Sequence, residues 1–326
     1  NQQTQQNTQR TMWRWREEAI GVVMVGFLAL VLATLVPSLL PGTQLVHLQQ
    51  GRLHAGVGFV LCALVFFLLR APRRGALSSV FACLLLSSIG WFVWQSSADH
   101  APQRTSEFTL ISFNMLGSNA RGQEIATYLT NEAPDVVFAL EALALRDDLD
   151  AMAAVFPHRA GCWPGPRCDM ALFSKHPFGE VEIVPFDPIN GRLVRAQVML
   201  PEGQITLVAA HLTKPYWGVW HEVQMDQLVD LLQSIDGPVV LAGDFNSQAF
   251  VATFREHVMD GAQMQLASGM VPTWPALPSL PLSMAGFAID HVLVRGAITP
   301  VSVGVIEDPL GSNHRGLIAR FDLDGS

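Results

Sequence analysis

Charged residues are scarce in this sequence. Asp, Glu, Lys and Arg make up 15% of its 326 residues, whereas hydrophobic residues make up 50%. A soluble domain ordinarily carries about 25% charged residues. The deficit is local, because the part before about residue 96 contains three long runs without a charge. This absence of charge favours helices in a membrane over buried helices of a soluble domain.

The three uncharged runs cover residues 19–40, 53–69 and 76–94. A helix of about 20 apolar residues crosses the hydrocarbon core of a bilayer. A cleaved signal peptide fits poorly, because the first run is too long and two more follow it. We therefore expect three transmembrane helices after a tail of residues 1–18. The first ten residues are polar and Gln-rich, and we expect them to be disordered.

Basic residues predict the orientation of these helices. Short loops rich in Lys and Arg stay on the cytoplasmic side. The basic residues lie before the first run (Arg10, Arg14, Arg16) and between the second and third runs (Arg70, Arg73, Arg74). The loop between the first and second runs contains a single Arg, Arg52. We expect a cytoplasmic N-terminus, with everything after Trp94 outside the cytoplasm.

Positive charge is scarce in the remainder of the chain. Residues 95–106 are polar and suggest a linker, and residues 107–326 carry 12 basic against 25 acidic side chains, a formal charge of −13. This balance weighs against a broad, non-specific grip on duplex nucleic acid, which needs a basic surface. It does not exclude a nuclease whose bound metal supplies the positive charge.

Cysteine is also rare, with four in the chain. Cys62 and Cys83 fall inside apolar runs, where a cysteine behaves as a small apolar residue. Cys162 and Cys168 flank a Pro- and Gly-rich loop. We expect them to form a disulfide in an oxidising compartment. No second pair of ligands nearby suggests zinc.

Residues 107–326 alternate apolar runs with turns, which predicts many strands and few helices. Such a pattern is typical of two packed sheets with helices outside. The expected strands cover residues 108–113, 136–140, 170–173, 181–184, 193–200, 204–210, 239–243, 289–294, 301–306 and 316–321. The expected helices cover residues 123–131, 147–155, 220–235 and 249–258.

Metal-binding or proton-transferring side chains follow several of these strands. They are Asn114, Glu141, His211, Asp244 with Asn246, and Asp290, while His314 lies in a turn before the last strand. Each has an ordinary structural role open to it, as a turn former, a helix-end charge or a buried histidine. Together, at the ends of apolar strands, they predict one polar site.

The same residues carry a resemblance to the endonuclease/exonuclease/phosphatase (DNase I-like) superfamily. The matching segments, in the family's order, are Ile111–Asn114, Asp135–Glu141, Met170–Lys175, Ala210–Leu212, Gly243–Asn246, Ile289–His291 and Ser312–His314. The resemblance implies a four-layer α/β sandwich, in which two packed mixed β-sheets are flanked by helices. It also implies hydrolysis of phosphoesters with Mg²⁺ or Mn²⁺.

The three apolar runs and Thr273–Ala276 further resemble a membrane-anchored bacterial branch of that superfamily. This implies a bacterial inner or plasma membrane, with the catalytic domain of residues 107–326 in the periplasm or at the cell surface.

The resemblance also implies roles for single residues. Glu141 would be the main metal ligand, with Asn114 beside it. Asn313 stands where the family usually has Asp, and it keeps one oxygen acceptor with which to hold the metal or its waters. Leu140 stands where many relatives have Gln.

The remaining motif residues would act on the substrate. His314 would be the general base or the imidazole that activates the phosphate, with its tautomer held by Asp290. Asp244 and Asn246 would orient the attacking water and the phosphate, and His211 would contact a phosphoryl oxygen. These assignments suit phosphoryl transfer, which needs charge neutralisation and a proton acceptor.

The substrate stays open at the level of sequence. Arg192, Arg195 and Lys214 lie near the motifs and are candidates to bind phosphate, as is Arg315. Four tryptophans near the motifs are candidates to stack on bases or enter a lipid interface: Trp163, Trp217, Trp220 and Trp274. A phosphodiesterase acting on nucleic acid or a phospholipid headgroup, a phosphomonoesterase acting on a small ligand, and a non-catalytic membrane-anchored sensor remain alternatives. The sequence identifies no protein partner.

Overall fold

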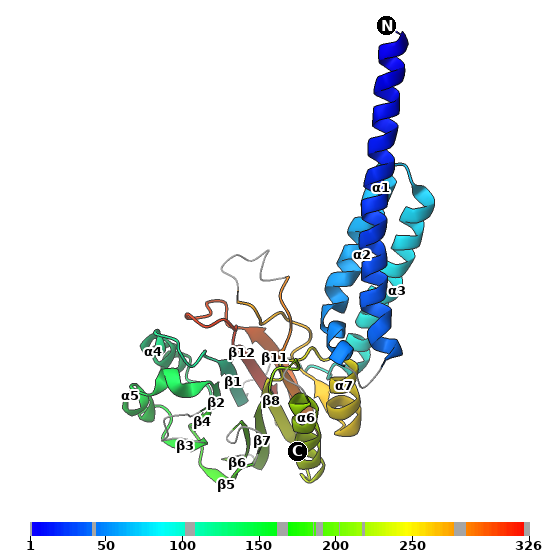
Figure 1. Cartoon of the computed structure of the whole chain (residues 1–326). Helices are drawn as coiled ribbons and strands as arrows, with labels where there is room; N and C mark the ends of the chain where they lie inside the picture. Colours follow the sequence, from blue (N-terminus) through cyan, green and yellow to red (C-terminus); the bar gives the residue numbers. More distant parts are fainter. Residues whose placement is uncertain are drawn as a thin grey trace. The chain divides into compact units, whose positions relative to one another are not determined.

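The structure is a computed structural model that describes residues 2–40, 44–101, 108–161, 169–184, 186, 192–201, 203–216, 219–276 and 285–322. The chain divides into two compact units, Asn1–Phe92 and Val93–Ser326 (Figure 1).

The first unit is helical. It contains α1 (Gln2–Leu39), the short helix η1 (Gln44–Gly51), α2 (Arg52–Leu68) and most of α3 (Pro72–Ser96). Three segments are long and apolar enough to cross a membrane: Met12–Pro37, His47–Leu68 and Pro72–Ser96. The prediction that the first ten residues are disordered is wrong for residues 2–10, because α1 already begins at Gln2.

Aromatic packing and one cap hold these helices together. The rings of Phe27, Phe59 and Phe81 contact one another with centroids 5.4–5.5 Å apart. Arg16 donates from Nε to the carbonyl of Leu69 at 2.7 Å, just after the end of α2. A guanidinium at this position satisfies a carbonyl that the helix leaves unpaired.

The second unit contains two six-stranded sheets. The first sheet has the order β11 (Thr299–Val305), β12 (Leu317–Asp322), β1 (Phe108–Asn114), β2 (Val136–Leu140), β4 (Met170–Ser174), β3 (His158–Gly161). The second has the order β5 (Phe178–Ile183), β6 (Leu193–Leu200), β7 (Gly203–His211), β8 (Val239–Asp244), β10 (Asp290–Arg295), β9 (Gln265–Leu266). The sequence did not predict the short strands β3 and β9.

Helices cover the outer faces of the two sheets, as expected for a four-layer sandwich (Figure 1). Buried side chains such as Phe138, Ala209 and Ala242 fill the core between the sheets. The helices are α4 (Gly122–Glu132), η2 (Ala142–Leu145), α5 (Leu149–Ala153), α6 (Trp220–Gln233), α7 (Ala252–Phe254) and the π-helix η3 (Arg255–Gly261). The single helix expected over residues 249–258 is therefore α7 followed by a π-helix.

Strand register brings the polar strand ends together. β7 and β8 run parallel and place His211 opposite Asp244, while the antiparallel partner β10 places Asp290 opposite the same Asp244. In the other sheet β1 and β2 run parallel, with Asn114 opposite Leu140, so Glu141 follows immediately. The site-bearing ends of both sheets thus belong to the strands at their centres.

Glycine is required where β7 meets the end of β8. Gly243 has φ +149°, and a Cβ built on it would lie 1.8 Å from the carbonyl oxygen of Ala210. That separation is far below any van der Waals contact, so a larger residue would push the two strands apart directly before Asp244.

The chain joins the second unit immediately after α3. Ser97 bridges Leu266 in parallel, the amide of Ala98 donates to the carbonyl of Leu266 at 2.9 Å, and the amide of Ala101 donates to that of Pro300 at 2.8 Å. Ala98 is 6% exposed within the core. Within the linker predicted over residues 95–106, Ser97, Ala98 and Ala101 thus pair with the sandwich. Residues 102–106 lie outside the described part.

Candidate active site

Asp244, at the end of β8, is the centre of the site. It is 1% exposed. Its Oδ2 accepts a hydrogen bond from Nδ2 of Asn114 at 3.0 Å, and its Oδ1 accepts one from the amide of Asn246 at 2.8 Å. Both carboxylate oxygens are thus held in fixed directions by two predicted site residues.

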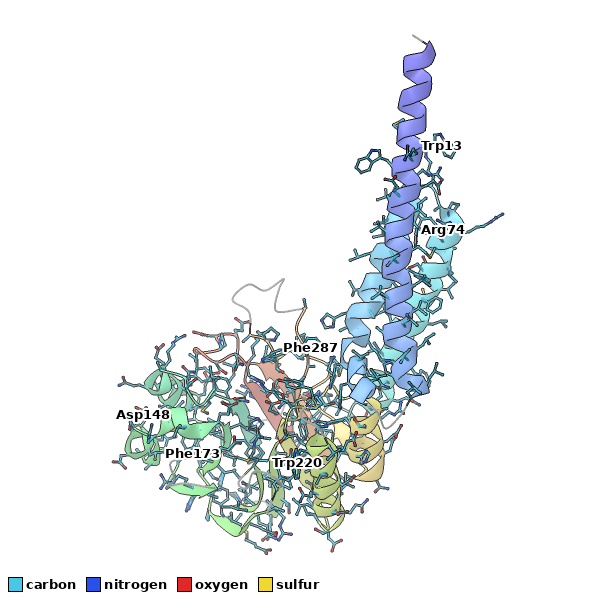
Figure 2. The ribbon with its side chains drawn as sticks, in the orientation of Figure 1. Trp13, Arg74, Asp148, Phe173, Trp220 and Phe287 are labelled. Carbon is cyan, nitrogen blue, oxygen red and sulfur yellow. The ribbon has the colours of Figure 1, made fainter. Side chains whose placement is uncertain are left out.

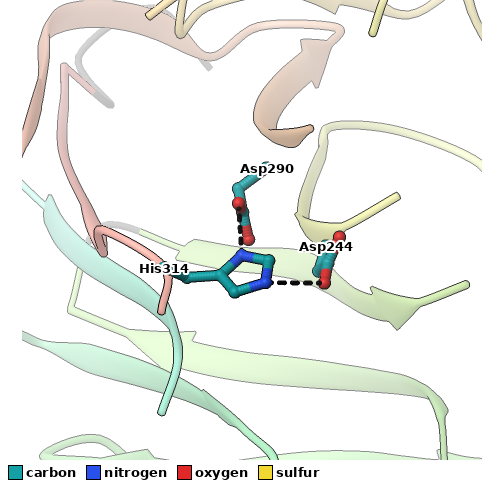
Figure 3. A group of neighbouring side chains, drawn as sticks. All are labelled: Asp244, Asp290 and His314. Atoms are coloured by element: carbon teal, nitrogen blue, oxygen red, sulfur yellow. Dashed lines mark hydrogen bonds and ion pairs between the residues drawn. The ribbon is translucent and has the colours of Figure 1, made fainter. Parts of the chain in front are cut away.

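An Asp–His pair lies on one side of Asp244. His314 donates from Nδ1 to Oδ2 of Asp290 at 2.9 Å, and its Nε2 lies 3.7 Å from Oδ2 of Asp244 (Figure 3). The turn that carries His314 is tied to β1, because Ser312 Oγ donates to the carbonyl of Asn114 at 2.7 Å. This pair is the arrangement expected from the sequence.

Surrounding carboxylates make the His314 imidazole basic. Burial by itself lowers the pKa of His314, but Asp290, then Asp244 and more weakly Glu141, raise that pKa to about 9. In the metal-free protein the ring therefore carries a proton at neutral pH and offers an N–H toward Asp244.

A second Asp–His pair lies on the other side of Asp244. His211 Nδ1 lies 2.7 Å from Oδ2 of Asp169, and its Nε2 lies 3.7 Å from Oδ2 of Asp244. Arg192 donates from Nη2 to His211 Nε2 and from Nε to Asp169 Oδ2. Both ring nitrogens of His211 are thus held by partners, Nδ1 by Asp169 and Nε2 by Arg192.

Asp169 remains ionised in this pair. Burial would raise the pKa of its carboxyl, but His211 and Arg192 beside it hold that pKa below its ordinary value. The sequence analysis missed Asp169. Asp169 lies directly before an apolar strand, whereas Asp244 lies at the end of one. This position beside a strand was the only feature of the sequence that could have indicated a role for Asp169 in the site.

Glu141 and Asn114 lie at the ends of the two central strands of the first sheet. Glu141 Oε2 accepts a hydrogen bond from the amide of Gly117 at 2.9 Å. Its backbone has φ +50°, in the left-handed region. A residue with a Cβ resists this conformation, and such strain recurs at functional sites.

Two buried histidines hold the turn after β8 from outside the site. Nε2 of His221 and Nε2 of His291 donate to the carbonyls of Phe245 and Ser247, at 3.0 Å and 2.9 Å. Asn246, with φ +49°, donates from Nδ2 to the carbonyl of Leu212 at 2.9 Å. Burial lowers the pKa of His291 to about 4, against opposing effects of Ser247 and Asp244, so this ring is neutral. We assign neither histidine a chemical role.

Three other predicted residues form no hydrogen bond or ion pair with Asp244 in the described part of the chain: Arg195, Lys214 and Asn313. Arg195 pairs with Glu180 and Glu182 of β5 at 3.0 Å and 3.1 Å, which occupies its guanidinium away from the strand ends. Lys214 is exposed on the loop after β7. Asn313 is exposed, and its backbone carbonyl accepts from the amide of Ala276 at 2.8 Å.

The loop of Thr273, which the sequence analysis singled out through Trp274 and Thr273–Ala276, supports β10. Thr273 Oγ1 accepts from the amide of Asp290 at 3.2 Å, and its carbonyl accepts from the amide of Arg315 at 2.9 Å. Further predictions fall outside the described residues: those for Cys162, Trp163, Cys168 and Trp217.

The donor set suits a hard divalent cation. Asp244, Asp290 and His314 offer ligand atoms that all lie within 4.8 Å of one another, and this buried group could bind a metal ion. Glu141 and Asn114 add carboxylate and amide oxygens nearby. Sites rich in oxygen ligands favour Mg²⁺ or Mn²⁺ over softer metals.

Comparisons with known proteins agree with the fold. Residues 111–314 match the model of the endonuclease/exonuclease/phosphatase family. A UPF0294 protein of Vibrio cholerae is 31% identical over 145 residues, which cover 44% of this chain and 49% of that protein. The chain thus spans about half the length of the Vibrio cholerae relatives it matches. A UPF0294 protein of Vibrio vulnificus is 22% identical over 250 residues, covering 71% of this chain and 82% of that protein.

Solved structures of similar fold include an endonuclease/exonuclease/phosphatase from Beutenbergia cavernae, with TM-score 0.54 and 22% identity over 67% of this chain and 72% of that one. They also include D. rerio TDP2 complexed with a single-strand DNA product, with TM-score 0.52 and 21% identity over 67% of this chain and 100% of that one. At this level of identity the likeness concerns the fold.

Proposed function

The chain belongs to the endonuclease/exonuclease/phosphatase family, whose members are metal-dependent phosphoester hydrolases, and on this premise we propose that it is a membrane-anchored phosphodiesterase. The observation that carries the proposal is the position of Asp244 between two Asp-paired imidazoles, His211 and His314. A hydrolase of this kind must orient a water, accept its proton and bind the phosphate. The side chains of Asp244, His314 and His211 can together perform these three functions.

Each residue has a role in this proposal. Asp244 and Asn246 orient the attacking water, and His314 accepts its proton at Nε2 while Asp290 holds the ring. Arg192 and His211 face a phosphoryl oxygen on the opposite side. A Mg²⁺ or Mn²⁺ ion held by Glu141 and Asn114, with support from Asn313, would neutralise charge on the phosphate and lower the pKa of His314 toward neutrality.

The charges of the site favour a diester over a monoester. Four carboxylates surround it, namely Glu141, Asp169, Asp244 and Asp290, while the guanidinium of Arg192 is already paired with Asp169. A phosphomonoester brings up to two negative charges and a diester only one, so the diester meets less repulsion here.

The direct test is hydrolysis by the full chain in detergent, with and without EDTA. Its substrates are a soluble diester and its monoester, DNA, RNA and phospholipid. His314→Ala is expected to lower the rate roughly 10²- to 10⁴-fold, the usual contribution of a general base. Asp244→Asn is expected to lower it at least as far, because it removes the carboxylate shared by both histidines.

His176→Ala is the matched control for this test. His176 is another Asp-paired histidine, with Nε2 2.9 Å from Oδ1 of Asp135, but it follows β4 at the opposite end of the strands from Asp244. Its loss is expected to leave the rate within about twofold. Unchanged rates in both site variants would overturn the assigned roles. If the wild type hydrolyses no substrate with Mg²⁺ or Mn²⁺, the non-catalytic sensor becomes the better hypothesis.

We further propose that the domain lies outside the cytoplasm of a bacterial cell. The basic residues before the first span and between the second and third support this orientation. A fusion of alkaline phosphatase to the C-terminus is expected to be enzymatically active. A fusion of green fluorescent protein at the same place, exported by the same route, is expected to be non-fluorescent. The opposite pattern would place the domain in the cytoplasm.

A further inference from the structure

Exposed apolar side chains cluster on the loop between β7 and α6. Tyr216, Val219 and Trp220 are 65%, 60% and 41% exposed, and Lys214 beside them is also exposed. Trp220 is labelled at the start of α6 in Figure 2. Single exposed apolar residues are ordinary, but these three lie within five positions of the chain, up to the first residue of α6. We call these four residues the rim loop.

Hydrogen bonds fasten the rim loop to the candidate active site on both of its flanks. Before it, the carbonyl of Leu212 accepts from Asn246, and the amide of Thr213 donates to Gln224 Oε1 at 2.6 Å. After it, His221 donates to the carbonyl of Phe245, the residue between Asp244 and Asn246. A surface bound by the rim loop is therefore held beside Asp244.

Chain connectivity also keeps this unit close to any bilayer that contains α3. The apolar helix α3 ends at Ser96, and Ala98 is already buried in the core of the sandwich. One residue spans at most about 3.5 Å, so no slack separates the end of the helix from the folded domain. A bilayer crossed by α3 would therefore be separated from the sandwich by only a few residues of the chain.

The chemistry of the rim loop fits a lipid–water interface better than a nucleic acid. Trp and Tyr have apolar rings with one polar group and collect at membrane interfaces, where Lys reaches the headgroups. Val219 has no ring to stack on a base. The formal charge of −13 on residues 107–326 also repels a polyanion.

We propose that the rim loop docks into the headgroup region of a phospholipid bilayer, and that the adjacent site hydrolyses a phosphodiester of a bilayer lipid. The docking of the rim loop is inferred from the exposure of its side chains and from the short connection to α3. The assignment of a lipid substrate rests on the proposed function. Two experiments test the docking and the substrate separately.

The first experiment measures docking without turnover. The full chain, with p-benzoylphenylalanine in place of Val219, is assembled in nanodiscs of phosphatidylethanolamine and phosphatidylglycerol and irradiated. The expected product is a lipid adduct at position 219, detected by mass. The control replaces Met199, which is 44% exposed but pairs with Gln204 at the other end of β7, and is expected to give no adduct. No adduct at position 219, or equal adducts at both positions, would overturn the docking.

The second experiment compares turnover of lipid with turnover of a soluble diester. The variant Tyr216→Ser, Val219→Ser, Trp220→Ser is expected to lower the ratio of lipid to soluble-diester turnover roughly tenfold, because its apolar contact with the interface is lost. Met199→Ser is expected to leave this ratio unchanged. An unchanged ratio in the triple variant would overturn the lipid assignment, as would a selective loss of single-stranded DNA hydrolysis. A wild type that forms the adduct at position 219 but hydrolyses nothing would refute the proposed function and leave the docking established.

Discussion

Two imidazole nitrogens, Nε2 of His211 and Nε2 of His314, lie 3.7 Å from the same oxygen of Asp244. Their environments nevertheless differ. Three carboxylates, those of Asp290, Asp244 and Glu141, raise the pKa of His314, whereas His211 is held between Asp169 and Arg192. The two imidazoles beside Asp244 therefore have different hydrogen-bond partners.

The raised pKa of His314 makes a prediction for the metal-free protein. Asp290→Asn removes the charge that raises this pKa most, so the imidazole is expected to titrate well below pH 9, as NMR in EDTA would measure. The raised pKa also makes the stability of the folded protein depend on pH. The Asp290–His314 pairing stabilises the wild type fully below pH 6.5, and this stability is lost as pH rises through about 9. A variant ring that still titrated near pH 9 would contradict the assigned cause.

The sequence predicted both residues of the Asp290–His314 pair, but only His211 of the Asp169–His211 pair. Asp290 and His314 each belong to a recognisable motif, whereas Asp169 has no pattern to distinguish it from a turn residue. Arg195 was predicted as a phosphate ligand because it lies near the motifs in sequence. The pairing of β5 with β6 brings Glu180 and Glu182 to its guanidinium, which no local pattern indicates. Contacts between distant strands are not encoded in local spacing.

At the scale of elements, the geometry of β7 and β8 depends on one glycine. Gly243→Ala is expected to destabilise the protein by more than about 3 kcal/mol, because the new Cβ would collide with a backbone carbonyl that cannot move away. Thermal unfolding of the full chain in detergent measures this.

Gly203→Ala is the matched control for Gly243→Ala. Gly203 has nearly the same φ, +148°, but nothing lies within 4 Å of its built Cβ. Its substitution should cost only the backbone strain, about 1–3 kcal/mol. Equal losses in the two variants would show that strain alone, and not the contact with Ala210, requires Gly243.

The existence of most strands was predictable, but their arrangement was not. Residues 136–140 and 193–200 were predicted as strands with the observed bounds, because buried apolar runs of this length are distinctive. The alternating polar run of β3 and the two residues of β9 carry too little signal. The π-helix η3 also has the composition of an ordinary helix, and its i→i+5 bonding depends on tertiary contacts.

At the scale of the whole molecule, the segment Ser97–Ala101 belongs to the sandwich. Starting the domain at residue 107 instead of residue 97 removes two backbone hydrogen bonds and the buried Ala98. We expect the shorter form to be less stable by roughly 2–4 kcal/mol. Urea unfolding of residues 97–326 and 107–326 measures the difference, and equal midpoints with equal slopes would show that the segment contributes nothing.

The separation of an apolar helical part from the rest of the chain was predictable from composition, because three uncharged runs of membrane-spanning length rarely occur in a soluble domain. The boundary between the two was not. Polar residues at positions 95–106 suggest a linker, yet Ala98 is small and apolar enough to fit the core beside Leu266, a contact visible only after folding.

The left-handed backbone of Glu141 and Asn246 has a consequence for protein engineering. Glycine at either position would relieve roughly 1–2 kcal/mol of backbone strain, because it lacks the Cβ that opposes positive φ. A search guided by thermal stability alone would therefore favour substitutions that delete a proposed metal ligand and a proposed phosphate-orienting amide. Stability and activity are in opposition at these two positions, so a library of thermostable variants must be screened for both.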